Sequence, residues 1–198
     1  MAIILLISIA KGVQRDVTEQ VTDLGVNLLV VVPFRIAEGS MFAPNVAGLS
    51  YLRLVDVERV RRVPGVRRAA PVTFVGGSIR AGERQSPTTF IVAAGADWFN
   101  VRPTGYSEGR AYSLAEEDEP VVVLGGIARE RLFGSESAVG KEVIVNGKPY
   151  RVVGVTRDES SEGSIFSMGS FENFAFIPFQ RFATDMPDPQ LHRIMVQT

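Results

Sequence analysis

The densest group of side chains that could do chemistry is the acidic run Glu116, Glu117, Asp118 and Glu119. Paired carboxylates can exchange protons with a substrate or hold a calcium ion. Consecutive residues point in different directions, however, and the run lacks the ligand spacing and central glycine of an EF-hand loop. We therefore expect a solvated loop, because runs of like charge are usually exposed.

Nucleophilic and metal chemistry would need side chains that the sequence scarcely provides. It contains no cysteine, which excludes disulfides, thiolate nucleophiles and cysteine-based zinc sites. The single histidine, His192, cannot build a histidine-rich metal site, and we expect it at the surface or at a strand end. Ser160, Ser161 and Ser164 lack the G-x-S-x-G pattern of a nucleophile elbow, and only His192 could activate them. We expect no catalytic residue and no metal site.

Leu124-Gly125-Gly126 lies between an expected strand and an expected helix, where backbone N–H groups can bind an anion. The surrounding residues match neither G-x-G-x-x-G nor G-x-x-x-x-G-K-[ST], so there is no nucleotide-binding pattern. We expect a tight turn here and no cofactor.

One apolar group stands in a Ser/Gly-rich context, where a buried core is not expected. Phe166, Met168 and Phe171 lie within residues 157–171, which we expect to form a mobile loop. They either fold onto the domain or form an exposed apolar lip that contacts a partner or a hydrophobic substrate.

The composition of the chain is that of a folded domain with no preference for nucleic acid. Of the 198 residues, 45% are hydrophobic and 22% charged, and the net charge is -1. A nucleic-acid partner is disfavoured, because there is no basic excess to neutralise phosphates.

The first residues are the least typical of a water-soluble domain. Ala2–Ile9 is almost wholly apolar, and an apolar stripe at Ile9, Val13, Val17, Val21 and Leu24 then predicts an amphipathic helix over residues 9–24. A run of eight is too short for a membrane span of about 20 residues. It is either the end of a membrane helix that leads into a stalk, or a buried strand or helix.

Hydrophobic period and turn residues predict the remaining elements. Residues 27–32 read as a strand buried on both faces, and Pro71 suggests an edge or a bulge in a strand over residues 66–75. Asn146-Gly147 is a strong hairpin signal between strands 143–145 and 150–155. The other expected elements are a loop at 35–53, helices at 55–63, 127–133 and 180–186, a short turn or helix at 97–100, a hairpin of 78–80 with 88–94, and strands at 121–124, 173–179 and 191–196.

Five phrases in this order resemble the extracytoplasmic domain of MacB/FtsX-like ABC-transporter permeases. They are Leu24–Pro33 (LGVNLLVVVP), Asp56–Val66 (DVERVRRVPGV), Phe99–Tyr112 with its Glu108-Gly109-Arg110, Val121–Phe133, and Val139–Val155 (VGKEVIVNGKPYRVVGV). The resemblance covers nearly the whole chain.

The resemblance implies an α+β fold of two lobes. A porter-like lobe of two β-α-β units would comprise residues 26–76 and 150–198, and a mostly β, sabre-like insertion would comprise residues 77–149. Residues 1–25 would be the end of a membrane helix and its amphipathic stalk.

The resemblance also implies a mechanical role without catalysis. Such a domain lies on the periplasmic side of the bacterial inner membrane and is moved by an ABC ATPase subunit or domain through the membrane helices. It works in a homodimer and, where an outer membrane must be crossed, with a periplasmic adaptor protein. Its working parts would be the stalk, the lobe interface and the loops at 35–50 and 157–171.

Two alternatives remain open. Related permeases serve lipoprotein or lipid release, cell division and peptide sensing, and the phrases do not separate these roles from macrolide-type export. A soluble α+β enzyme or binding domain with an apolar N-terminus is the other, and it would need a convergent polar site.

Overall fold

A computed structural model of the chain describes residues 27–33, 52–157, 173–186 and 189–198. Nearly all of these residues belong to one mixed β-sheet and the helices that cover it. The strands are β1 (Leu28–Val31), β2 (Arg68–Val75), β3 (Ile79–Ala81), β4 (Arg84–Gln85), β5 (Phe90–Ala94), β6 (Tyr106–Gly109), β7 (Val121–Leu124), β8 (Glu142–Val145), β9 (Lys148–Thr156), β10 (Phe174–Pro178) and β11 (Arg193–Gln197). The helices are α2 (Leu54–Arg61), α3 (Trp98–Val101), α4 (Gly126–Phe133), α5 (Phe179–Thr184) and the 3-10 turn η1 (Leu114–Glu116).

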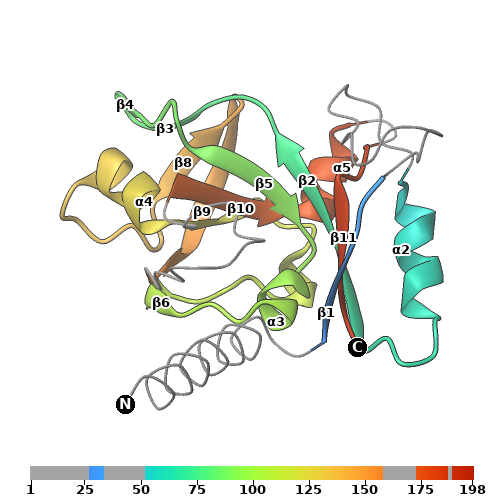
Figure 1. The fold of residues 1–198 in the computed structure, drawn as a ribbon. Helices are drawn as coiled ribbons and strands as arrows, with labels where there is room; N and C mark the ends of the chain where they lie inside the picture. Colours follow the sequence, from blue (N-terminus) through green and yellow to red (C-terminus); the bar gives the residue numbers. More distant parts are fainter. Residues whose placement is uncertain (1–26, 34–51, 158–172, 187–188) are drawn as a thin grey trace, which may run out of the picture.

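The strand order interleaves segments that are far apart in the sequence. It runs β1-β11-β2-β5-β10-β7-β9-β8-β3-β4, and β6 pairs with β9 beside this path. Only the β5–β10 and β7–β9 pairs are parallel among the described strands. Figure 1 shows β5 and β10 crossing the middle of the molecule in a different direction from β1 and β11, so the sheet is strongly twisted.

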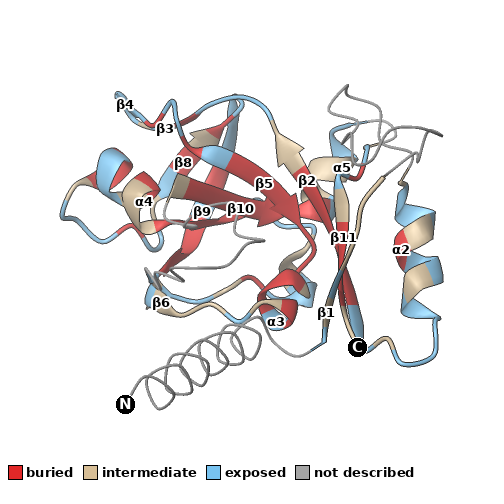
Figure 2. Ribbon diagram, in the orientation of Figure 1, coloured by how far each residue is buried: buried red, intermediate tan, exposed pale blue. Residues whose placement is uncertain are grey.

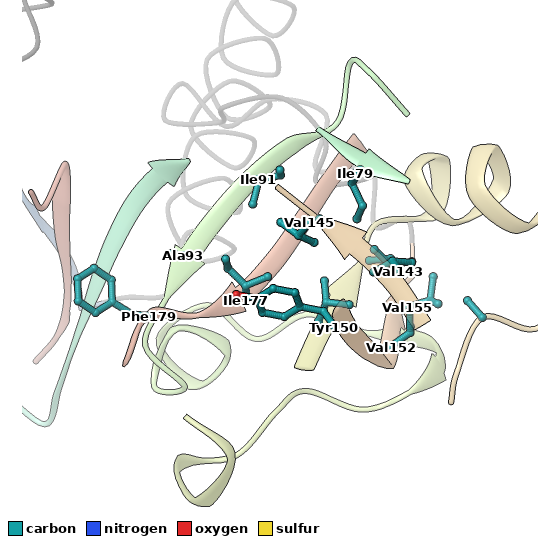
Figure 3. Close-up of a cluster of buried hydrophobic side chains, with 14 of the residues drawn as sticks. Ile79, Ile91, Ala93, Val143, Val145, Tyr150, Val152, Val155, Ile177 and Phe179 are labelled. Atoms are coloured by element: carbon teal, nitrogen blue, oxygen red, sulfur yellow. The ribbon is translucent and has the colours of Figure 1, made fainter. Parts of the chain in front are cut away.

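Each face of the sheet carries its own hydrophobic core because successive strand residues point to opposite faces. In β10, Ala175 and Ile177 belong to one cluster, whereas Phe174 and Phe176 belong to the other. The first cluster also receives residues of α2, α4 and α5, and Figure 3 shows its side chains from β3, β5, β8, β9 and β10 directed toward one another. The second is covered by α3 and by side chains near β6. Figure 2 shows the middle strands, β5 and β10, almost wholly buried.

Several predictions from the sequence are confirmed. The α+β class is observed, and the order strand–helix–strand occurs both in β1-α2-β2 and in β10-α5-β11. The Asn146-Gly147 turn joins β8 to β9 with positive φ angles of 49° and 82°. At the start of α2 the Asp56 carboxylate accepts the Arg53 N–H at 2.9 Å, as the third residue of a capping box does.

The predicted burial of the first strand was wrong. Residues 27–32 were expected to be buried on both faces, but β1 is a sheet-edge strand that pairs with β11, and Leu29 is 56% exposed. A continuous apolar run cannot distinguish a central strand from such an edge strand by periodicity alone.

The expectation for Pro71 was also wrong. β2 has hydrogen-bonded neighbours on both sides, β11 and β5. In an antiparallel pair the nitrogen and the carbonyl of one residue face the same neighbouring strand, and the Pro71 carbonyl accepts the N–H of Gly95, at 3.0 Å. Its missing donor therefore faces the point where β5 ends, and one ladder hydrogen bond at most is lost.

The hairpin expected between residues 78–80 and 88–94 forms differently. β3 turns at Gly82-Glu83 into the short β4, whereas β5 pairs with β2 and β10 in the centre of the sheet. The apolar residues of β5 find burial on both faces there. Since β5 lies in the predicted insertion, one sheet runs through both predicted lobes, and the boundaries at 76/77 and 149/150 stay a prediction.

Candidate functional site

Residues 106–117, called the 106–117 segment below, dock against β9 through close backbone contact. Gly109 has φ +62°, and a Cβ on it would lie 2.2 Å from the carbonyl oxygen of Val153. A Cβ on Gly154 would lie 2.1 Å from the carbonyl oxygen of Arg110. Glycine is required at both positions, because the two backbones approach more closely than any side chain permits.

Glu108 fixes this segment to α4 and to the loop after it. Its Oε1 accepts hydrogen bonds from Nε and Nη2 of Arg129, at 3.0 and 2.8 Å. Its Oε2 accepts from Ser137 Oγ at 2.7 Å and from the Ala138 N–H at 3.0 Å. Burial alone would raise the pKa of Glu108, but the hydrogen bonds from Ser137, Arg129 and Ala138 lower it overall. The carboxylate is therefore a structural anchor with its oxygens occupied.

The acidic run was expected to be a solvated loop, and for its first two residues this was wrong. Glu116 receives Arg110 Nη1 and Nη2 at 2.7 and 2.8 Å and the Ser113 N–H at 2.9 Å. These bonds lower its pKa to about 2. Glu117 Oε1 accepts the Ala96 N–H at 2.7 Å. Asp118 and Glu119 are exposed, as expected.

Two tyrosines of the same segment enter the core. The Tyr112 hydroxyl lies 2.9 Å from the carbonyl oxygen of Ala94 and 3.1 Å from that of Ile177, so it joins the ends of β5 and β10. Burial raises the pKa of Tyr112 well above its usual range. Burial also raises the pKa of Tyr106 to about 12. Both phenols stay protonated at physiological pH, so neither is poised as a base.

The edge strand β1 and its neighbour β11 form a second distinctive feature, called the β1–β11 ribbon below. The Thr198 N–H donates to the carbonyl oxygen of Asn27 at 3.0 Å, and Leu28 lies opposite Gln197. The N-terminal end of β1 and the C-terminal end of β11 therefore lie side by side. On its other edge β11 pairs with β2 from Arg193 to Gln197.

Two further candidate residues from the sequence, His192 and Gly125, lie next to different elements, β11 and α4. His192 is exposed just before β11, where its Nδ1 accepts the Phe74 N–H at 3.3 Å. Partial burial, followed by the charge of Arg193, lowers its pKa. Gly125 caps α4 in extended conformation, and its N–H donates to the Phe174 carbonyl. This is the expected tight turn.

In the part of the chain that the structure describes, no group of three or more Asp, Glu, His or Cys side chains could hold a metal ion. No described helix is long and apolar enough to cross a membrane. Ser160, Ser161 and Ser164 lie outside the described residues.

The proposed contact residues Phe166, Met168 and Phe171 also lie outside the described residues, as do the stalk over 9–24 and the loop at 35–50. The described chain resumes at Asn173, whose Nδ2 donates to the carbonyl oxygen of Thr88 at 2.6 Å. Beside it, Phe90 is 60% exposed and its ring lies 5.4 Å from that of Phe174.

Residue types alone did not reveal the role of the 106–117 segment. The available signal was the phrase Glu108-Gly109-Arg110 with Tyr112, which resembles the permease domains. Each of the four residues makes a specific contact: Glu108 with Arg129, Gly109 with Val153, Arg110 with Glu116, and Tyr112 with Ala94. These contacts fix the shape of the domain.

A sequence profile of the MacB-like periplasmic core domain matches residues 1–198. The chain belongs to this family.

Curated relatives of this MacB-like domain are much longer proteins. The Macrolide export ATP-binding/permease protein MacB of Aggregatibacter actinomycetemcomitans is 23% identical over 165 residues, which are 82% of this chain and 25% of that protein. The protein of the same name from Azoarcus sp. (strain BH72) is 27% identical over 183 residues, 90% of this chain and 26% of that protein. The chain thus spans about a quarter of the length of these relatives.

Two solved structures share the fold of this MacB-like domain. The periplasmic region of MacB from Actinobacillus actinomycetemcomitans superposes with a TM-score of 0.71 at 20% identity, over 89% of this chain and 77% of that one. The extracellular domain of the noncanonic ABC-type transporter YknZ from Gram-positive bacteria gives 0.67 at 18% identity, over 87% and 83%. The α+β fold with its mixed sheet is common to all three.

Proposed function

We propose that this chain is the non-catalytic extracytoplasmic domain of an ABC-transporter permease, on the outer side of the bacterial cytoplasmic membrane. It passes motion driven by ATP hydrolysis to the substrate that the transporter exports. The match of the MacB-like family profile over residues 1–198 carries the proposal. The names of the relatives, ATP-binding/permease proteins for macrolide export, support the ATPase partner and the direction of transport.

The geometry supports a mechanical role. Glu108 and Tyr112 bind backbone groups of other parts of the domain, the Ala138 N–H and the Ala94 carbonyl. The sheet is continuous from β1 to β4, and a continuous hydrogen-bonded sheet resists bending and carries displacement across the domain. Asn27, just before β1, and Thr198, just after β11, lie side by side, a geometry suited to a domain held by two membrane segments.

The assembly that follows from this proposal has three further parts. An ABC ATPase, fused or separate, acts on the domain through membrane helices, of which Ala2–Ile9 would be the end of the first. Two copies work in a homodimer. A periplasmic adaptor protein contacts the domain where an outer membrane must be crossed, and Phe166, Met168 and Phe171 are the proposed contact residues for a partner or substrate.

The coding sequence on both sides of these residues tests the proposal. We expect an apolar run of about 20 residues that ends at Ile9. We expect three further runs downstream and an ABC ATPase domain or gene next to them. A reading frame without membrane helices and without an ATPase neighbour would overturn the proposal.

A further inference from the structure

In the β1–β11 ribbon the N-terminal end of β1 lies beside the C-terminal end of β11. β1 and β11 are antiparallel, with Leu28 opposite Gln197 and Val31 opposite Ile194. At the open end the Thr198 N–H donates to the Asn27 carbonyl. A force on residue 27 and a force on residue 198 therefore enter the domain at adjacent atoms.

The direction of these forces decides whether the hydrogen bonds between β1 and β11 break. If the two ends separate sideways, the ribbon opens from Asn27 and Thr198 inward and its hydrogen bonds break one after another. If both ends move in the same direction, the load falls on the β11–β2 ladder, where the bonds from Arg193 to Gln197 resist together. The ribbon is weak against separation and strong against joint displacement.

The contacts of the ribbon favour joint movement. Ile194 and Val196 are buried in the first hydrophobic cluster, and Met195 is buried in the second. Leu28 and Val30 pack against the second cluster, and Val31 packs against the first. Opening the ribbon would expose apolar surface on both faces of the sheet, which costs free energy in proportion to area.

We propose that the β1–β11 ribbon is a closed handle through which both membrane attachments move the domain as one body. This inference rests on the proposed function, in which the chain returns to the membrane after β11. Nine interstrand steps separate β1 from β4, or roughly 43 Å along the sheet at about 4.8 Å per step. A rotation of the handle would therefore displace the β3–β4 end, which Figure 1 places far from the C-terminus.

A disulfide across the ribbon tests this directly, because the chain contains no cysteine. Leu28 and Gln197 face each other at a position without mutual backbone hydrogen bonds, as the neighbouring Thr198–Asn27 bond indicates. Cα atoms at such a position are about 4.5 Å apart, within the range of a disulfide. Arg80 and Gln85 form the same kind of pair in the β3–β4 hairpin, since the Ser86 N–H donates to the Ile79 carbonyl, and provide the matched control.

The measurement is ATP hydrolysis by the purified full-length transporter that carries L28C and Q197C, with any other cysteines replaced, before and after oxidation. The handle predicts that the disulfide forms and that oxidised and reduced protein differ by less than about twofold. A larger loss that a reductant restores, while oxidation of the R80C/Q85C control has no effect, would show that the strands must separate. Failure of the L28C/Q197C disulfide to form would also overturn the handle.

The same double substitution in the isolated 1–198 chain keeps the two proposals distinguishable. We expect the disulfide to form there too and to raise the unfolding temperature, because it constrains the unfolded chain. A parent protein without membrane helices would remove the proposed function, whereas loss of activity on oxidation in a working transporter would remove only the handle.

Discussion

The 106–117 segment and the β1–β11 ribbon both lie at margins of the sheet, yet they are held in different ways. The segment depends on the contacts of single residues, such as the Glu108 carboxylate and the glycine at position 154, which neighbouring residues cannot replace. The ribbon is held by a backbone ladder and by half-buried aliphatic residues such as Leu28 and Val30. We infer that the segment keeps the domain rigid at the cost of sensitivity to substitution, whereas the ribbon tolerates side-chain changes.

The largest effect that would sharpen this comparison is expected from Gly154→Ala. The new Cβ would lie 2.1 Å from the Arg110 carbonyl oxygen and 2.9 Å from its nitrogen. Backbone atoms on both sides cannot yield without displacing β6, so we expect a loss of about 3 kcal/mol in the free energy of unfolding. Urea unfolding measures it. Gly126→Ala is the matched control, because a Cβ there meets nothing within 4 Å, and equal losses in the two variants would refute close docking of the segment.

Glu108→Ala should give the next largest effect. It removes one carboxylate that accepts four hydrogen bonds and leaves Arg129 without its charged partner. We expect a loss of about 2 kcal/mol in the free energy of unfolding. Hydrogen exchange should locate the loosened amides at residues 106–110 and 137–138. If protection is unchanged there, Glu108 does not anchor the segment.

The Glu116–Arg110 pair predicts a pH dependence of smaller size. The pKa of Glu116 is about 2 in the folded protein and about 4.3 in an unfolded chain. The carboxylate therefore stabilises the fold fully above about pH 5, and this contribution is lost as the pH falls toward 2. Arg110 is 60% exposed, so solvent screens the pair and we expect only about 1 kcal/mol.

Glu116→Gln is the variant that isolates this carboxylate. Its unfolding free energy should fall less steeply between pH 5 and pH 2.5 than that of the unsubstituted chain. Parallel pH profiles would mean that the Glu116 carboxylate has no preferential interaction in the folded state.

The smallest effect is expected in the ribbon, from Leu29→Lys. Leu29 is 56% exposed on an edge strand, where a lysine is well tolerated and discourages pairing with other strands. The free energy of unfolding should change by less than about 0.5 kcal/mol. A loss as large as that of Glu108→Ala would show that the ribbon depends on single side chains too, and the comparison would fail.

The sequence predicted the local elements well and the long-range pairings poorly. Asn146-Gly147 is a local signal, and it correctly placed the β8–β9 hairpin. The parallel pairing of β5 with β10 joins residues about 84 positions apart, such as Phe90 and Phe174, and no local pattern encodes it.

The same limit applies to the 106–117 segment. The donors to Glu108 come from Arg129, Ser137 and Ala138, on elements whose proximity only the folded sheet creates. Glu116 likewise reads as one acid among four until Arg110 and Ser113 are placed beside it. Only resemblance to the permease domains marked this stretch in advance.

The most direct test of the central claim is where the domain lies in the cell. A single cysteine at Glu83, which is exposed at the β3–β4 turn, can be probed in the full-length protein with a membrane-impermeant maleimide. A cysteine at the buried Val123 is the control and should react only after denaturation. We predict that E83C is labelled in intact cells whose outer barrier admits the reagent. Labelling only after the cytoplasmic membrane is broken would place the domain inside the cell and contradict an extracytoplasmic role.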